Sequence, residues 1–129
     1  MNEHSLERLK KVDYSLVSVI VEAEKTSPIR FEITQGYRTI EEQQELYKKG
    51  RVYPGLKVTD CDGVKKRSKH NFFPSRAVDV VCYIDNKVTW NRSVYKKLSE
   101  HILSVALKMN IPVKWGGSFK NFDGPHYQI

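Results

Sequence analysis

Apolar residues in the first part of the chain recur every three or four positions, the spacing of one helix face. They are Leu6, Leu9, Val12, Leu16, Ile20 and Ala23. The pattern predicts an amphipathic helix over residues 4–26. It should end before Pro28, because proline disrupts a helix interior.

The period then changes from that of a helix to that of strands. Apolar and polar residues alternate over residues 29–34, which predicts a half-buried strand ended by Gly36. The run AVDVVCYI at residues 77–84 is rich in β-branched residues and predicts a buried strand. Short extended segments near 113–115 and 126–129 should complete a small sheet.

Two further helices are predicted, with a long loop between them. Thr39 is placed as an N-cap and Glu42 completes its capping box, while Gly50 ends that helix. Residues 51–67 contain two turn signals and no sustained period, so they form a loop, and loops of that length usually carry function. Apolar spacing predicts the other helix over residues 94–109.

This order of elements predicts an α+β fold with a small, mainly antiparallel sheet packed with about three helices. The chain has 129 residues, close to the usual size of one domain. We therefore expect a single domain over residues 1–129, with the N-terminal helix at about 4–26 and a core at about 29–129.

The chain is basic, with 22 Lys and Arg against 15 Asp and Glu. A positive surface favours encounters with polyanions such as nucleic acid, anionic lipid or acidic cell wall, without choosing among them. Part of the excess is one run, which is either a phosphate-binding patch or a solvated loop. The run comprises Lys65, Lys66, Arg67 and Lys69.

No apolar run is long enough to cross a bilayer, and the start MNEHSLERLKKVD has no signal-peptide pattern. We expect a monomer made in the cytoplasm, without membrane insertion, that reaches the outside by another route. Cys61 and Cys82 lack a CxxC spacing, and the apolar surroundings of Cys82 predict a buried thiol.

Asp79 is the most informative polar residue because it interrupts an apolar strand. A buried carboxylate needs a cation, a metal or several hydrogen bonds. His70 precedes it by nine residues, and His126 lies on a predicted C-terminal strand. Two imidazoles and one carboxylate are a common ligand set for catalytic zinc, although a structural Asp bonded to backbone or lysine remains an alternative.

Asp123 lies three residues before His126, in the sequence DGPHYQ. A carboxylate beside a metal-bound water can accept its proton and later deliver it to a leaving amine. Asp-Gly-Pro is also a strong turn signal, and the two roles are compatible.

Four segments in order resemble one family of zinc peptidases over residues 34–129: GYRTIEEQQELYKKGR, PGLKVT, SKH followed by AVDVV, and WGG ahead of DGPHYQ. The family includes D-Ala-D-Ala carboxypeptidases and dipeptidases and phage L-alanyl-D-glutamate endolysins. The resemblance implies one zinc per chain, held by His70, Asp79 and His126, with Asp123 as the catalytic acid and base.

The resemblance also implies that Arg38 steadies the substrate carbonyl and its developing negative charge, and that Gln43 and Ser68 contact the substrate. One feature departs from the family. The link NFFPSRAV between His70 and Asp79 is two residues longer than usual and lacks its glycine, which leaves the path of residues 71–76 open.

The expected function is zinc-dependent hydrolysis of the L-Ala–D-Glu bond of bacterial peptidoglycan by a phage endolysin acting on the cell wall. Cleavage of D-Ala-D-Ala is the alternative within the same chemistry. A non-catalytic module that binds polyanions through the basic run, and a metal-binding relative without activity, are rivals. We expect no specific nucleic-acid partner.

Overall fold

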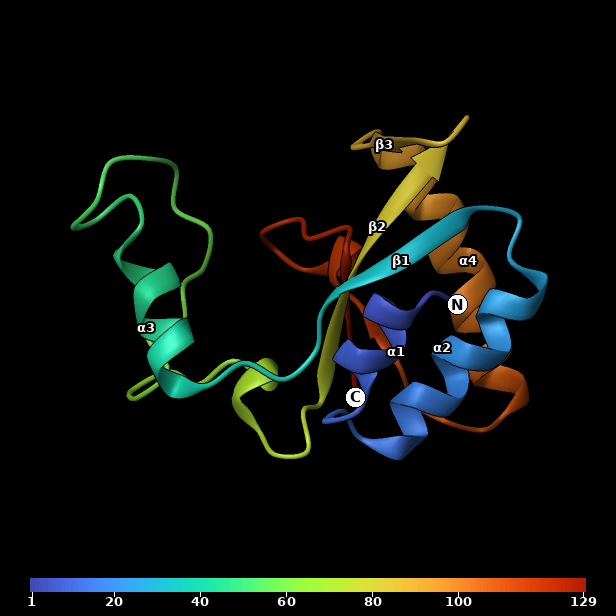
Figure 1. Ribbon diagram of the computed structural model, residues 1–129, viewed down its shortest axis with the longest axis horizontal. Helices are drawn as coiled ribbons and strands as arrows, with labels where there is room; N and C mark the ends of the chain where they lie inside the picture. Colours follow the sequence, from blue (N-terminus) through green and yellow to red (C-terminus); the bar gives the residue numbers. More distant parts are fainter.

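The computed structural model describes residues 1–129 and confirms an α+β fold, in which helices cover one side of a five-stranded sheet (Figure 1). The helices are α1 (Glu3–Leu9), α2 (Tyr14–Thr26), α3 (Ile40–Lys48) and α4 (Arg92–Lys108), with 3₁₀ turns at Lys69–Asn71 and Gly116–Ser118. The strands are β1 (Arg30–Gln35), β2 (Ala77–Ile84), β3 (Lys87–Thr89), β4 (Lys114–Trp115) and β5 (His126–Gln128). None of the helices is both long and apolar enough to cross a membrane.

The sheet is antiparallel and centred on β2. Its order is β1-β2-β5-β4, and β3 pairs with the far end of β2. Alternate residues of a strand face opposite sides of the sheet. Val78, Val80 and Cys82 of β2 join the core beneath α1, α2 and α4, so Asp79 faces the other side. The same alternation on β5 sends Tyr127 into the core and leaves His126 on the face of Asp79.

The N-terminal segment departs from the prediction, because residues 4–26 form two helices rather than one. Residues 11–13 leave the helix to bond with residue 75: Ser75 N donates to the Lys11 carbonyl and Asp13 N donates to the Ser75 carbonyl, each at 2.8 Å. Asp13 then caps α2 by accepting from Ser15 N. The apolar period continues across the break because both helices face the same core.

Strand β3 was not predicted. It follows a tight turn in which Asp85 and Asn86 both have positive φ, and its three residues are largely exposed. The four remaining strands, the capping box of Thr39 and Glu42 and the helix over residues 92–108 match the predictions. The count of helices is four, instead of about three.

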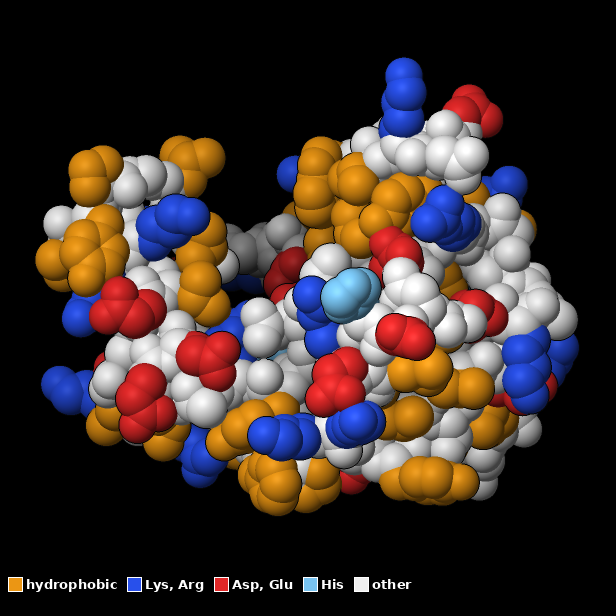
Figure 2. All heavy atoms as spheres, in the orientation of Figure 1, with side chains coloured by type: hydrophobic (Ala, Val, Ile, Leu, Met, Phe, Trp, Pro, Cys, Tyr) orange, Lys and Arg blue, Asp and Glu red, His pale blue; other side chains and the backbone are white.

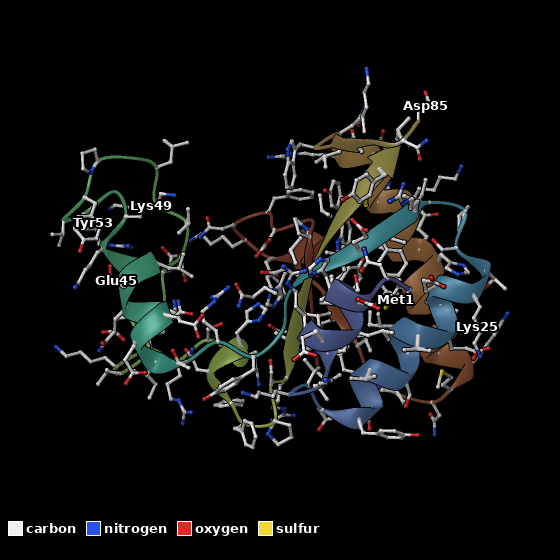
Figure 3. All side chains as sticks on the ribbon, in the orientation of Figure 1. Met1, Lys25, Glu45, Lys49, Tyr53 and Asp85 are labelled. Atoms are coloured by element: carbon white, nitrogen blue, oxygen red, sulfur yellow. The ribbon has the colours of Figure 1, made fainter.

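Residues 40–67, which comprise α3 and the loop after it, form a separate projection that we call the α3 lobe; the remaining residues are the body. In Figure 1 the lobe stands apart from the sheet, and in Figure 3 its residues Glu45, Lys49 and Tyr53 lie far from Met1 and Lys25 of the body. The predicted loop over residues 51–67 contains no helix or strand. Two segments, 36–39 and 68–71, connect the lobe to the body.

Candidate metal centre

Asp79 and His126 meet because β2 and β5 pair in a register that places them directly opposite each other. Both side chains lie on the sheet face away from the helices, and Asp79 Oδ1 is 3.2 Å from His126 Nδ1. The strand alternation that buries Tyr127 therefore also brings a carboxylate and an imidazole together on the open face.

His70 reaches the same point from a 3₁₀ turn. Ser68 begins this turn, and its hydroxyl accepts from His70 N. The His70 Nδ1 donates to the Gly36 carbonyl at 2.7 Å, which directs Nε2 towards Asp79 Oδ1, 3.4 Å away. This Nε2 is buried and has no hydrogen-bond partner. A buried polar atom without a partner is costly, so the arrangement favours a bound cation at this point.

The three side chains fit a zinc ion. Their ligand atoms all lie within 4.8 Å of one another. Tetrahedral ligands at about 2.0–2.1 Å from zinc are about 3.3 Å apart, close to the two distances that Asp79 makes. The outer nitrogen of each imidazole is also held, as zinc-binding histidines require: His70 by Gly36, and His126 by Gln128 Oε1 at 2.8 Å.

The charges at this point are strongly coupled. Burial opposes ionisation of Asp79, but the nearby imidazoles of His126 and His70 outweigh it and hold the pKa of this carboxyl below its usual value. Burial likewise opposes the charged form of His126, and the bond to Asp79 raises the pKa of His126 above its usual value. Asp79 is thus an anion with two imidazoles facing it, a donor set suited to a divalent cation.

Arg38 lies beside this cluster, on the segment that follows β1. Its Nη2 is 3.7 Å from Asp79 Oδ2, and its Nη1 donates to Gln43 Oε1 at 2.7 Å. Burial lowers the pKa of Arg38, although the charge of Asp79 partly offsets this. The Nε of Arg38 is buried and has no partner, so one donor beside the cluster is still free.

Asp123 lies on the loop between β4 and β5 with its side chain half exposed, and its Oδ2 is 4.0 Å from His126 Nδ1. Burial and the nearby charge of Asp79 raise its pKa. The predicted turn is present: His126 N donates to the Asp123 carbonyl, and Asp123 N donates to the Gly116 carbonyl. This turn fixes the carboxylate beside the cluster and leaves it accessible.

The longer link after His70 bulges outward and leaves the cluster intact. Arg76 N donates to the Lys69 carbonyl at 3.0 Å, which closes the base of the bulge. Within it Phe73 is exposed, whereas Ser75 is fully buried and donates to the Ala77 carbonyl. Both ends of the bulge are therefore fixed where they enter the site.

The cluster opens into a cleft of about 970 Å³ between the lobe and the body. Figure 2 shows the hollow between them. The sheet face and His70 line its floor, residues 57–61, 66 and 67 line the lobe side, and residues 119–123 line the body side. Residues 68 and 69 of the connecting segment also line it. A peptide-sized ligand entering it would meet His70, Asp79, His126, Arg38 and Asp123 together.

Comparison with known proteins gives these residues a context. The model of one protein family, described as phage L-alanyl-D-glutamate peptidase, matches residues 1–128. The chain belongs to this family.

Two relatives carry the same activity in their names. The chain is 32% identical over 102 residues to the peptidoglycan L-alanyl-D-glutamate endopeptidase CwlK of Bacillus subtilis (strain 168), a match over 75% of this chain and 59% of that protein. It therefore spans less than two thirds of the length of this relative. The crystal structure of the L-Ala D-Glu endopeptidase ChiX of Serratia marcescens superposes with a TM-score of 0.82 and 30% identity, covering all of this chain and 88% of that one.

A more distant structure shares the fold. The D,D-pentapeptidase VanY of a VanB-type resistance cassette, solved with Zn(II), superposes with a TM-score of 0.59 and 18% identity over 91% of this chain and 71% of that one.

In this member of the phage L-alanyl-D-glutamate peptidase family, the two residues expected to contact substrate, Gln43 and Ser68, both form hydrogen bonds within the protein. Gln43 is fully buried, and besides Arg38 it bonds Thr59 Oγ1 and the Cys61 carbonyl. Ser68 caps the turn of His70 and lines the cleft. The geometry thus gives Gln43 a positioning contact to Arg38, and its contact with substrate stays a prediction.

Sequence reasoning missed the residues that orient the imidazoles. Gln128 follows His126 by two positions on the same strand, so the period of two could have identified it as a neighbour on the same face. The Gly36 carbonyl offered no such signal, because a backbone acceptor 34 residues away leaves no mark in the side-chain pattern.

Proposed function

We propose that this protein is a zinc-dependent peptidase that hydrolyses the L-Ala–D-Glu bond in the stem peptides of bacterial peptidoglycan, as a phage endolysin acting on the cell wall. Residues 1–129 form one zinc peptidase domain that works as a monomer with one zinc. The observation that carries the proposal is the convergence of His70, Asp79 and His126 on the floor of a cleft that also presents Arg38 and Asp123.

The three ligands leave one side of the candidate centre facing the cleft. Bound there, zinc supplies Lewis-acid chemistry, polarising a carbonyl and lowering the pKa of a coordinated water. Asp123 is the base that takes a proton from the attacking water and then returns it to the departing nitrogen. Arg38 donates to the carbonyl oxygen as it gains negative charge, a role for which its side chain lines the cleft beside Asp79.

The bond is chosen from the family and from the two relatives named as L-alanyl-D-glutamate endopeptidases. Digestion of purified peptidoglycan by the zinc-loaded protein, followed by mass spectrometry of the fragments, tests the choice. New amino-terminal D-Glu supports the proposal. Release of free D-Ala would identify a carboxypeptidase instead, and an undigested wall would contradict peptidase function altogether.

The role of Asp123 has its own test. The variant Asp123→Asn should retain zinc and thermal stability and lose activity by a factor of about 10²–10⁴, the usual contribution of a positioned acid or base. The matched control is Asp85→Asn, the same chemical change in the exposed turn after β2, where asparagine tolerates the positive φ. Full activity of Asp123→Asn in the digestion assay would remove Asp123 from the mechanism.

A further inference from the structure

The basic run over residues 65–69 divides into groups with different surroundings. Arg67 and Lys69 both lie over the ring of Phe72, at 5.0 and 5.3 Å from its centre. Lys66, Arg67 and Lys69 line the cleft, whereas Lys65 does not. Lys66 makes no ion pair and contacts no aromatic face, so its charge is available to a ligand.

Hydrogen bonds hold the backbone around Lys66 in a defined turn. Asp62 Oδ1 accepts from Val64 N at 2.9 Å and from Lys66 N at 3.0 Å, and Gly63 N donates to the Lys66 carbonyl. Gly63 is buried against the side chain of Gln43, and a Cβ at Gly63 would lie 3.2 Å from it. This turn is thereby fixed to the residue that holds Arg38.

Two more lysines without an ion pair line the cleft. Lys57 is on the lobe side and Lys120 is on the body side. The neighbour of Lys120, Asn121, donates to Asp60 Oδ2 across the cleft at 3.1 Å, which brings the two walls together beside Lys120. The three lysines therefore line one cleft from both of its walls.

The cleft as a whole has an excess of positive charge. Six basic and three acidic side chains line it. Two of the acids are engaged, Asp79 with the imidazoles and Asp60 with Arg51 and Asn121. A concave site with unpaired cations around its opening selects an anionic ligand, since charge of one sign in a cleft concentrates the opposite sign.

The proposed substrate supplies an anion at this place. A glutamate residue has two carboxyl groups, and only one of them forms the next amide bond of the chain. The other stays free within a few bonds of the nitrogen that leaves when the L-Ala–D-Glu bond is cut. Amidation of that carboxyl removes its charge without changing the scissile bond.

We propose that Lys57, Lys66 and Lys120 form a carboxylate-binding rim that recognises the free carboxylate of the glutamate beside the scissile bond. This inference rests on the proposed function and specifies its substrate as the acidic, non-amidated stem peptide. A polyanion-binding surface is disfavoured, because the unpaired lysines lie on two walls of a concave cleft and do not form one exposed patch.

Binding measured in the Asp123→Asn background separates recognition from catalysis. The probes are N-acetyl-L-Ala-D-Glu-L-Ala amide with the spare glutamate carboxyl either free or amidated, titrated by calorimetry at low salt. The test variant is Lys66→Gln with Lys120→Gln. The control is Lys65→Gln with Lys114→Gln, which removes the same charge from exposed positions outside the cleft.

The parent should bind the free acid about three- to tenfold more tightly than the amide, as exposed ion pairs of this number allow. The preference should fall towards one in the test variant, persist in the control, and weaken at high salt. Equal binding of the two peptides by the parent would contradict the proposed carboxylate-binding rim. Equal loss of the preference in the control and test variants would contradict it too. So would a short single-stranded DNA that binds the parent and loses affinity only in the test variant.

The proposed function is judged separately, from cleavage of the same two peptides by the zinc-loaded wild-type protein. Absence of cleavage for both would contradict the peptidase assignment, while the binding preference still decides whether the rim exists. Cleavage of both peptides at equal efficiency, with equal binding, would contradict the carboxylate-binding rim and still support the peptidase function.

Discussion

The body and the α3 lobe are held together by different forces. The body encloses a continuous core of 18 buried residues, contributed by α1, α2, α4, three strands and the segments next to them. Between residues 40 and 67 only Gln43 and Gly63 are buried, so the lobe has no apolar core of its own. Apolar burial stabilises the body, whereas hydrogen bonds centred on Gln43 hold the lobe in place.

The difference bears directly on the site. Asp79 and His126 belong to the sheet, and His70 is tied to it through Gly36. The candidate metal centre is therefore part of the stable body, and the lobe supplies one wall of the cleft. Regions with little buried apolar surface open at low free energy. The lobe can therefore move without disturbing the candidate metal centre.

The two free cysteines report on the two regions, and their reactivity should show the largest contrast. Cys61 is a partly exposed residue of the lobe, while Cys82 is buried in β2, where burial raises the pKa of its thiol to about 12. A thiol reagent should label Cys61 at least about 10³-fold faster, because Cys82 reacts only through global opening at a cost of about 5–15 kcal/mol. The labelling rate of Cys82→Ser reports on Cys61, and that of Cys61→Ser reports on Cys82. Comparable rates would show that the lobe and the body do not differ in this way.

A core substitution should destabilise the whole body. Leu98 on α4 is fully buried, and Leu98→Ala should lower the free energy of unfolding by about 2–5 kcal/mol. On the same helix Leu107 is 82% exposed, so Leu107→Ala should change it by less than about 0.5 kcal/mol. Chemical denaturation compares the two, and similar effects would mean that the core is not where the structure has it.

Substitution of Gln43 should loosen the lobe alone. Gln43→Ala leaves Arg38 Nη1 and the Cys61 carbonyl without their partner, at a local cost of about 1–3 kcal/mol. Hydrogen exchange should quicken over residues 40–67 and stay slow in β2, with zinc retained and activity reduced. Gln44→Ala, at the exposed neighbouring position, is the control. Faster exchange in β2 as well would show that the lobe and the body open together.

Much of the body could be predicted from the sequence, and so could the three residues that meet at the candidate metal centre. The apolar, β-branched run over residues 77–84 predicted β2, and the carboxylate of Asp79 stood out because it interrupts that run. The capping box at Thr39 and the turn at Asp123 rest on local chemistry and are both present. Local patterns suffice here because each element is specified by residues within it.

The rest depended on contacts between distant segments. The break between α1 and α2 arises from hydrogen bonds to Ser75, more than 60 residues away, and the apolar spacing passes over it unchanged. Gln43 was expected to face a substrate, but whether a polar residue on a short helix turns inwards depends on Arg38 and the loop at Cys61. The contact of Arg67 with the ring of Phe72, and the position of Lys66 in the cleft, likewise depend on tertiary placement.

Metal analysis of the purified protein tests the central claim most directly. The wild-type protein should contain one zinc per chain, and His70→Ala should contain essentially none, because it removes one of three ligands. His4→Ala, which removes an exposed histidine remote from the cluster, should keep the zinc. A wild-type protein without stoichiometric zinc, or a His70→Ala variant that binds it as well as the wild type does, would contradict the account.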